Sequence, residues 1–229
     1  EVDKILLKKL NLLKVKSPRL NDWKRVVDAK LNPKKKVTIA VVGKYVDLKD
    51  SYKSLNEALD HAGIVNLAKV EIHMIDAAKI TSANVSKVLK SYQAVLVPGG
   101  FGNRGIEGMI VACRFARENN LPYFGICLGM QIAIIEFSRN VLKLKNANST
   151  EFNSKTKYPV IGLVTEWKDA SGKIEHRNEN SNLGGTMRLG GQKCLIKKSS
   201  LSYRLYKKLT ITERHRHRYE VNPEFKKKL

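Results

Sequence analysis

The sequence predicts an α/β fold with a central, mainly parallel sheet. From Val37 onward, short apolar runs of strand length alternate with amphipathic stretches of helix length, joined by short connections. The first run, 37–42, is apolar almost throughout and ends at Gly43, which is typical of a parallel strand covered on both faces. Such an alternation requires crossover connections, and ligands of these sheets bind beyond the carboxyl ends of the strands.

Residues 1–36 differ in pattern from the rest of the chain. Two short amphipathic helices are expected, within 6–13 and 22–30, and a lysine-rich stretch follows them. We therefore expect 1–36 to be an interdomain linker, the tail of a preceding domain, and 37–229 to be the globular domain. Because the chain starts with Glu1 rather than Met, we expect it to begin partway through a longer protein.

Within the globular domain, apolar periodicity locates each element. Ser51 is expected to cap the first helix, because its hydroxyl can accept from a free backbone N–H. The expected strands are 37–42, 70–75, 93–97 and 123–126, and the expected helices are 51–62, 81–90, 106–118 and 128–138. Later segments are expected to be a strand at 160–167, a turn at 169–172, a glycine-rich stretch at 184–191, a short strand at 194–197 and a basic element at 212–222.

Composition excludes several classes of protein. Of the 229 residues 42% are apolar, enough for a core, and no run approaches the roughly 18 apolar residues of a membrane span. No signal peptide opens the chain, and the three cysteines lack the spacing of a disulfide framework or a zinc site. Because thiols persist in reducing compartments, we expect a cytoplasmic protein with no membrane partner.

The formal net charge of +22 is the unusual feature of the composition. Such a charge suggests an anionic partner, for example a nucleic acid. The lysines, however, are dispersed in short clusters and are not interleaved with aromatic residues as in single-strand binders. A lysine-rich surface without a nucleic-acid partner is the better interpretation, and a basic nucleic-acid-binding module is the alternative.

Cys127 lies at the centre of the strongest local pattern. An apolar strand leads to it, an apolar helix follows it, and Gly125 and Gly129 lie two residues away on either side. This is the pattern of a nucleophile elbow, a sharp turn that needs small neighbours and lifts the side chain out of the sheet. The helix N-terminus beneath the sulfur would favour the thiolate. A buried core cysteine is the alternative, and it is the better interpretation for Cys113, which lies on an apolar helical stripe.

A second glycine-bounded strand end occurs one strand earlier, at Pro98-Gly-Gly-Phe-Gly102. This turn can aim a backbone N–H at the neighbouring strand end, where Cys127 lies. Together with the N–H of Leu128 it would form an oxyanion hole. A loop with no such role is the alternative.

These motifs resemble class I glutamine amidotransferase domains, and in particular those of the CTP synthase family. Gly125-Ile-Cys-Leu-Gly-Met-Gln131 is similar to the nucleophile motif of these domains. Further similar segments, in the same order, are Gly43-Lys-Tyr45, Val97-Pro-Gly-Gly-Phe-Gly102, Asn146-Ala-Asn-Ser-Thr-Glu-Phe152, Gly184-Gly-Thr-Met-Arg-Leu189 and Glu213-Arg-His-Arg-His-Arg-Tyr-Glu-Val-Asn222. The resemblance, from about Val37 to the end, implies a three-layer, flavodoxin-like α/β domain. A glutaminase of another amidotransferase, such as those of GMP or anthranilate synthesis, is the alternative.

The resemblance also implies a role for each matching residue. Cys127 would attack the carboxamide of L-glutamine, forming a γ-glutamyl thioester and releasing ammonia, and Gly100 and Leu128 would supply oxyanion N–H groups. The implied glutamine-binding residues are Gly100, Phe101, Leu128, Gly129, Met130, Gln131, Glu151 and Arg218. A zwitterion needs a carboxylate for its ammonium and a donor for its carboxylate, which suits Glu151 and Arg218. A solvated loop carboxylate and a surface base are the alternatives for these two.

In the CTP synthase family, ammonia from the glutaminase passes to an N-terminal synthetase domain of the same polypeptide, which aminates UTP to CTP in pyrimidine biosynthesis. The resemblance therefore implies ATP and Mg²⁺ in that synthetase domain, GTP acting on the parent enzyme, and a homo-oligomeric parent. No cofactor and no metal are expected in the present domain, whose sequence has no Gly-x-x-x-x-Gly-Lys-Ser/Thr phosphate loop.

One part of the family pattern is missing. The family completes its catalytic triad with His-Pro-Glu, whose imidazole activates the cysteine. None of the five histidines here precedes Pro-Glu, and Asn222-Pro-Glu has Asn in the His position. His217 with Glu220 offers a substitute, but both belong to the segment expected to bind glutamine. We expect the chain to end before the missing motif and thus to lack the catalytic base.

Overall fold

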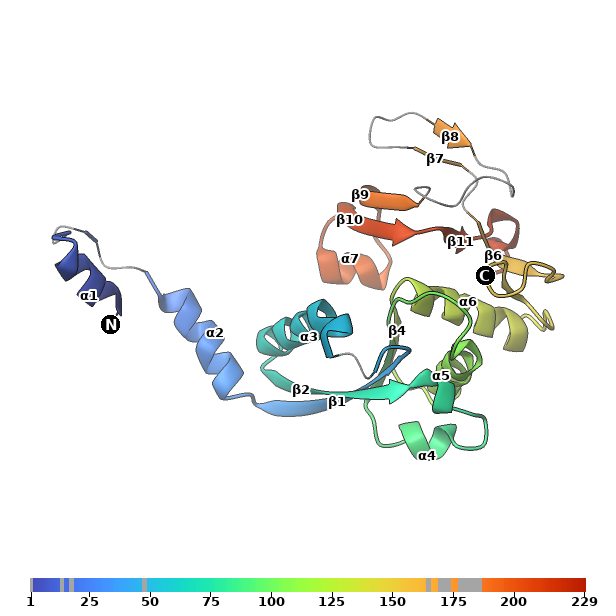
Figure 1. Cartoon of the computed structure of the whole chain (residues 1–229), viewed down its shortest axis with the longest axis horizontal. Helices are drawn as coiled ribbons and strands as arrows, with labels where there is room; N and C mark the ends of the chain where they lie inside the picture. Colours follow the sequence, from blue (N-terminus) through green and yellow to red (C-terminus); the bar gives the residue numbers. More distant parts are fainter. Residues whose placement is uncertain are drawn as a thin grey trace. The chain divides into compact units, whose positions relative to one another are not determined.

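The computed structural model describes residues 2–12, 15–16, 19–46, 49–163, 166–168, 174–176 and 187–229 (Figure 1). The chain forms two compact units. One consists of Glu1–Thr38 and Tyr52–Glu71, and the other of Ile39–Ser51 and Ile72–Leu229. In the part of the chain that the structure describes, no helix is long and apolar enough to cross a membrane. The domain boundary predicted after residue 36 stays a prediction.

The first unit is mainly helical. Its helices are α1 (Val2–Lys9), α2 (Asn21–Leu31) and α3 (Lys53–Val65), and it includes the first residues of strands β1 (Lys35–Gly43) and β2 (Ala68–Asp76). The helix expected within 22–30 is present as α2, whereas the one expected within 6–13 is shifted, because α1 begins at Val2 and ends at Lys9. Neither helix buries any residue. α2 packs against α3, where Lys30 pairs with Asp60 at 2.6 Å.

The start of α3 differs from the prediction. A 3₁₀ turn, η1 (Lys49–Tyr52), precedes this helix, so its N-cap is Tyr52 and no side chain caps it. The prediction that Ser51 caps the helix is wrong, because Ser51 lies inside the preceding turn.

The second unit is built on the parallel sheet that the sequence predicts. The strand order is β2, β1, β3, β4, where β3 is Ala94–Val97 and β4 is Tyr123–Gly125. β3 pairs in parallel with β1 on one side and with β4 on the other, so that Val97 lies opposite Gly125. The carboxyl ends of β3 and β4 therefore meet at one edge of the sheet, where such sheets bind ligands. This confirms the α/β class.

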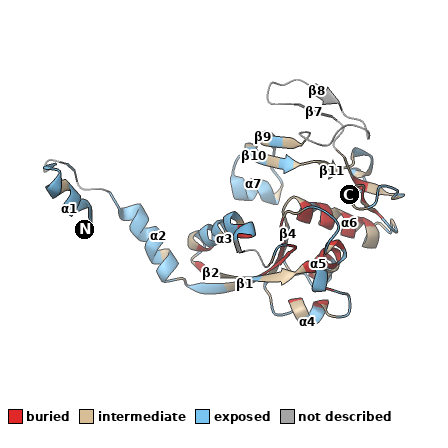
Figure 2. Ribbon diagram, in the orientation of Figure 1, coloured by how far each residue is buried: buried red, intermediate tan, exposed pale blue. Residues whose placement is uncertain are grey.

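Helices flank this sheet, and their buried faces pack against it to form the hydrophobic core. They are α4 (Val85–Leu89), α5 (Ile106–Glu118) and α6 (Leu128–Asn140), with a 3₁₀ turn η2 (Ala77–Lys79). α5 and α6 pack on each other and on β3 and β4, and their buried faces make up much of the core (Figure 2). Cys113 is buried in α5, as predicted. The buried carboxylate of Glu136 in α6 accepts from Arg117 of α5 at 2.8 and 3.0 Å, which satisfies a charge that would be costly alone.

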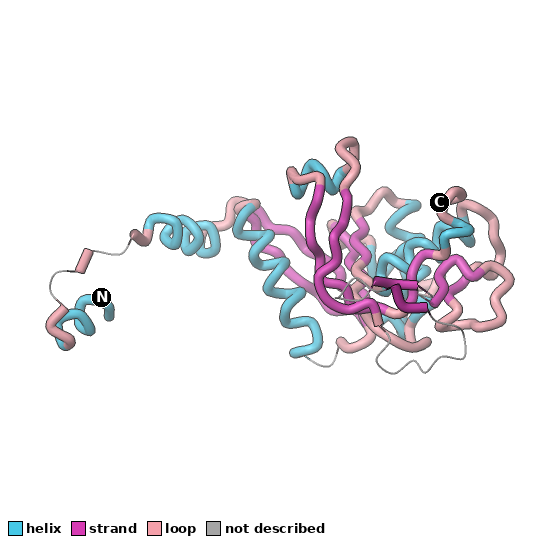
Figure 3. The backbone as a smooth tube through the Cα atoms, turned by 90° about the horizontal axis from the view of Figure 1, so that it is seen from above, coloured by secondary structure: helices cyan, strands magenta, loops and turns pink. Residues whose placement is uncertain are grey.

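Smaller sheets follow α6 in the chain, and Figure 3 draws the described strands in magenta. β11 (Tyr219–Val221), β6 (Pro159–Leu163) and β5 (Asn148–Ser149) form one sheet, in that order. β9 (Arg188–Leu195) pairs antiparallel with β10 (Thr210–His217), and β7 (Glu166–Lys168) with β8 (Ile174–His176). α7 (Leu201–Tyr206) lies between β9 and β10, and η3 (Pro223–Phe225) follows β11.

Several predicted boundaries in this region are revised. The strand expected at 160–167 is divided between β6 and β7, and residues 164–165 lie outside the described residues. The turn at 169–172 and the first residues of the glycine-rich stretch, 184–186, also lie outside them. Of the short strand expected at 194–197, residues 194–195 form the end of the longer β9, and 196–197 lie beyond it.

Candidate active site

Cys127 occupies the turn between β4 and α6. Its backbone has φ 53° and ψ −104°, a conformation that residues with a side chain rarely adopt. The flanking glycines are needed for close packing: a Cβ on Gly125 would overlap the carbonyl group of Gly129, and a Cβ on Gly129 would overlap the carbonyl oxygen of Val97. The predicted nucleophile elbow is therefore present, and packing of this kind can maintain backbone strain at a functional residue.

The loop at the end of β3 lies directly against the elbow. A Cβ on Gly99 would come 3.6 Å from the Cβ of Cys127, and a Cβ on Gly100 would come 3.3 Å from Cδ2 of Leu128. The two backbone segments expected to supply oxyanion donors are thus neighbours, while the oxyanion role itself stays a prediction.

The protonation of Cys127 differs from the expectation. Burial raises the pKa of its thiol; the hydrogen bond from the Leu128 N–H lowers it, and the nearby Glu151 carboxylate raises it further. The N–H at the start of the helix favours the thiolate as predicted, but desolvation outweighs it, so the net pKa is raised. Cys127 is therefore a neutral thiol at neutral pH, and it needs a base before it can attack.

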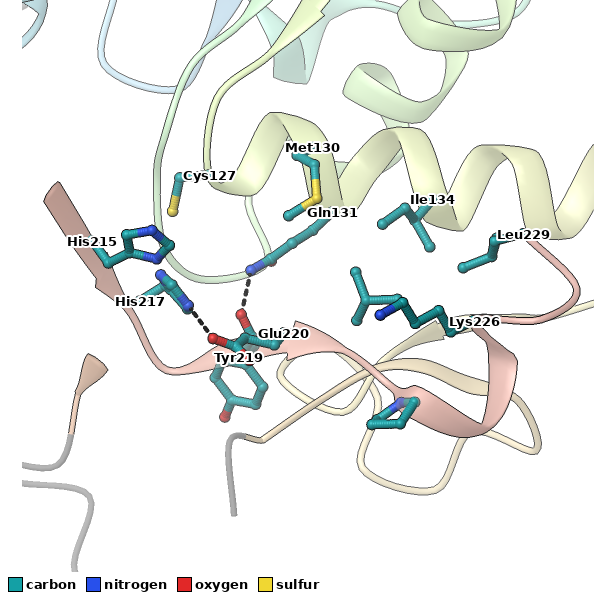
Figure 4. Close-up of a pocket in the computed structure, with 12 residues that line it drawn as sticks. Cys127, Met130, Gln131, Ile134, His215, His217, Tyr219, Glu220, Lys226 and Leu229 are labelled. Atoms are coloured by element: carbon teal, nitrogen blue, oxygen red, sulfur yellow. Dashed lines mark hydrogen bonds and ion pairs between the residues drawn. The ribbon is translucent and has the colours of Figure 1, made fainter. Parts of the chain in front are cut away.

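Cys127 lines a cavity of about 620 Å³ between α6 and the β10–β11 segment (Figure 4). Its sulfur lies 4.0 Å from the backbone oxygen of Arg216. The buried amide of Gln131 donates to the carbonyl oxygen of Tyr219 at 3.0 Å and so ties α6 to β11. The cavity is polar around Cys127 and apolar farther along α6, where Ile134 lines it.

An imidazole–carboxylate pair lines the same cavity. Nε2 of His217 lies 2.6 Å from Oε1 of Glu220, which is also 3.1 Å from Nε of Arg188. The hydrogen bond from His217 lowers the pKa of Glu220, against the effect of burial, and the Arg188 charge lowers it further. The neighbouring His215 has its pKa lowered by burial and by His217. The sequence offered His217 with Glu220 as a substitute for the missing triad pair, and the structure places this imidazole and carboxylate in the cavity of Cys127.

Lys44, at the end of β1, is a residue of this region to which the sequence analysis assigned no role. It is only 2% exposed, and its ammonium donates to the carbonyl oxygens of Phe101, at 3.0 Å, and Gly102. Glu151 accepts from the Gly102 N–H at 3.1 Å. Burial lowers the pKa of Lys44 to about 8; Glu151 raises it and Arg104 lowers it. The one signal in the sequence was its position directly after an apolar strand, where such sheets bind ligands.

Comparison with known proteins identifies the family. Residues 47–229 match the class I glutamine amidotransferase family. The chain belongs to this family. Among solved structures, this amidotransferase domain is similar to the glutaminase domain of Trypanosoma brucei CTP synthase with bound acivicin, at 39% identity and a TM-score of 0.70, covering 82% of this chain and 69% of that one. A putative peptidase E from Listeria monocytogenes EGD-e, at 18% identity, a TM-score of 0.33 and coverage of 53% and 62%, does not add to the assignment.

Of the residues predicted to bind glutamine in this amidotransferase domain, some line the cavity of Cys127 and others do not. Met130 and Gln131 line the cavity together with Cys127. Phe101 is 53% exposed at the rim of its loop. Gly129 faces the backbone of β3, so its role in the structure is packing.

Glu151 and Arg218 come from distant parts of the chain. The charges of both residues affect the pKa of Tyr219: burial and Glu151 raise it, and Arg218 lowers it. Nε of Arg218 is buried and, among the described residues, has no hydrogen-bond partner. A donor of this kind is suited to a ligand carboxylate. No group of three or more His, Cys, Asp or Glu side chains in the described ranges is placed to hold a metal ion.

Proposed function

We propose that this domain hydrolyses the side-chain carboxamide of L-glutamine with Cys127 as the nucleophile. The observation that carries the proposal is the strained backbone of Cys127, which presents the thiol to a cavity beside the Gly100 loop. The 39% identity of this chain to a glutaminase domain solved with bound acivicin supports the same chemistry.

The proposed reaction has two halves. An imidazole takes the thiol proton, and the sulfur attacks the carboxamide carbon, so that the carbonyl oxygen becomes an oxyanion facing the N–H groups of Gly100 and Leu128. Collapse of this intermediate breaks the C–N bond, and the imidazole returns its proton to the departing ammonia. Water then hydrolyses the γ-glutamyl thioester of Cys127. One glutamine and one water thus give one glutamate and one ammonia.

Glu151 and Arg218 would hold the two charged ends of glutamine. Glu151 would accept from the ammonium, and the unpartnered Nε of Arg218 would donate to the α-carboxylate. Because neither group contacts the scissile bond in this arrangement, they would position the substrate without exchanging protons with it.

We further propose that the ammonia aminates UTP to CTP in an N-terminal synthetase domain of the same polypeptide, with ATP and Mg²⁺ bound there. The similarity to the Trypanosoma brucei glutaminase domain favours this acceptor over those of other amidotransferases. In this proposal GTP acts on the parent enzyme, the parent is a homo-oligomer, and the protein is cytoplasmic.

The test uses the full-length protein and its Cys127→Ala variant. Wild-type protein should release ammonia from glutamine, and hydroxylamine should trap the thioester as γ-glutamyl hydroxamate, whereas Cys127→Ala should do neither. With an ammonium salt in place of glutamine, both proteins should form CTP from UTP and ATP. Glutamine hydrolysis by Cys127→Ala would contradict the nucleophile. Hydrolysis without CTP formation would contradict only the acceptor.

A second variant, His217→Asn, locates the base. General acid–base help is worth roughly 10²- to 10⁴-fold, so a loss of that size in kcat would identify His217 as the proton acceptor. A loss of less than about tenfold would place the base elsewhere in the protein, as the family resemblance implies.

A further inference from the structure

We propose that Lys44 is a positioning residue for glutamine hydrolysis, because its buried ammonium fixes the backbone of the loop that carries the Gly100 N–H. The inference rests on the proposed function and adds to it a residue outside the cavity of Cys127. Lys44 contacts neither the nucleophile nor the substrate in this arrangement, and it acts through the loop.

The peptide unit between Phe101 and Gly102 is held from both sides. A peptide unit is planar, and its C=O and N–H point in opposite directions. On one side Lys44 Nζ donates to the Phe101 carbonyl oxygen at 3.0 Å, and on the other side Glu151 Oε1 accepts from the Gly102 N–H at 3.1 Å. Lys44 also donates to the carbonyl of Gly102, the next unit along. Two opposed charged groups therefore determine the orientation of this unit.

The stem of the same lysine packs under Gly100. A Cβ on Gly100 would lie 3.4 Å from Cδ and 3.6 Å from Cε of Lys44, and 3.3 Å from Cδ2 of Leu128. The Gly100 backbone is thus enclosed between the lysine stem and the first residue of α6. Any motion of the Gly100 backbone would therefore have to displace the stem or the residues that its ammonium holds.

The energetics favour a role in the loop over a role in stability. Moving an ammonium from water to a site that is 2% exposed is unfavourable, and its lowered pKa reflects that cost. The Phe152 ring, 5.9 Å from Nζ, and the Glu151 charge offset only part of it. Apolar residues of similar volume often replace buried charges without loss of stability. A lysine at this position is therefore explained by the carbonyl oxygens that it orders.

The test compares Lys44→Met with Lys87→Met, a matched change at an exposed lysine of α4, in the full-length protein. In Lys44→Met, hydrogen exchange of the peptide covering 99–104 should become faster. The kcat for glutamine should fall about ten- to a hundredfold, since the loss of one oxyanion donor costs 10²- to 10³-fold. KM should change much less, because an oxyanion forms only after binding. Lys87→Met should change none of these quantities.

Alkylation of Cys127 by iodoacetamide distinguishes an effect on the Gly100 loop from an effect on the reactivity of Cys127 itself. This displacement at a saturated carbon develops no oxyanion, so its rate should be the same in wild type and Lys44→Met. Unchanged loop exchange, unchanged kcat, or alkylation slowed in parallel with kcat would each overturn the proposal. Lys44→Gln, whose shorter amide cannot hold both carbonyls, provides the same readouts if Lys44→Met fails to fold. If wild type does not hydrolyse glutamine, the proposed function fails, and the exchange measurement alone still tests Lys44.

Discussion

The close contact between α6 and β3 yields a quantitative prediction for Gly129→Ala. The added Cβ would lie well under 3.0 Å from the Val97 carbonyl oxygen, a separation that real Cβ atoms essentially never show, and 3.1 Å from the Val97 Cβ. These neighbours are backbone atoms or the first side-chain atom of Val97, so no flexible side chain can move aside. The Val97 oxygen also accepts from the Ile126 N–H at 2.9 Å. Relief of the overlap therefore stretches a hydrogen bond of the elbow itself.

The expected loss of stability combines two effects. Overpacking of a close-packed interior costs about 1–3 kcal/mol, and a weakened hydrogen bond adds up to about 1 kcal/mol. We expect Gly129→Ala to lower the free energy of unfolding by roughly 2–4 kcal/mol, against the 5–15 kcal/mol that folded domains typically have.

Gly162→Ala in β6 is the matched control, because a Cβ at Gly162 meets nothing within 4 Å. This change should be neutral or slightly stabilising, since alanine restricts the unfolded chain. Urea unfolding followed by circular dichroism measures both variants. The reasoning would be refuted if Gly129→Ala unfolded within about 0.5 kcal/mol of wild type, the range of ordinary surface changes, or if both variants lost equal stability.

Three further predictions concern charge and protonation. A glutamine-like electrophile should label Cys127 before either other cysteine, since burial raises the pKa of Cys113 to about 12; peptide mapping decides this. Glu151→Gln and Arg218→Ala should each raise KM roughly ten- to a hundredfold with little change in kcat, because hydrogen bonds to charged groups are worth about 1.5–3 kcal/mol. Loss of ammonia-dependent synthesis would instead assign them to the fold. Finally, the pKa of Lys44 is about 8 in the folded protein and 10.5 in the unfolded chain, so the free energy of unfolding of wild type should rise relative to that of Lys44→Met between these pH values. Urea unfolding measures this difference, and a difference that did not change with pH would contradict the prediction.

The parallel sheet could be predicted because its signals are local. The run 37–42 is continuously apolar, and the structure places it within β1. The stripe on 106–118 became the buried face of α5, with Cys113 in the core. The elbow was predictable for the same reason, since Gly125 and Gly129 are constrained by neighbours only a few residues away or on the adjacent strand.

The remaining features depend on partners that are distant in sequence. The carbonyl group that Lys44 binds at Phe101 is 57 positions away, so nothing near Lys44 indicates its burial. The pKa of Cys127 was misjudged because the helix N-terminus is visible in the sequence, whereas the tertiary burial that outweighs it is not. His217 was set aside as the base because its neighbours in the chain match a binding motif, and the sequence does not show that the β10–β11 segment lies against α6 beside Cys127.

Three residues of this part of the domain each have an unfavourable feature. Cys127 has a positive φ, Lys44 buries a charge, and Arg218 buries a donor that has no partner within the described residues. Each feature costs stability when considered alone. Local rules can fail where function requires it, and these three residues lie at the ends of the central strands and in the segment after β10. Similar features occur elsewhere in the described part of the chain, such as the positive φ of Asn120 and the unpartnered buried hydroxyl of Ser138. The strained backbone presents a nucleophile, the buried ammonium orders a loop, and the unpartnered donor is available to a carboxylate. A bound amino acid with a reactive carboxamide would use all three at once, which is why a site for glutamine explains their coincidence better than three independent defects.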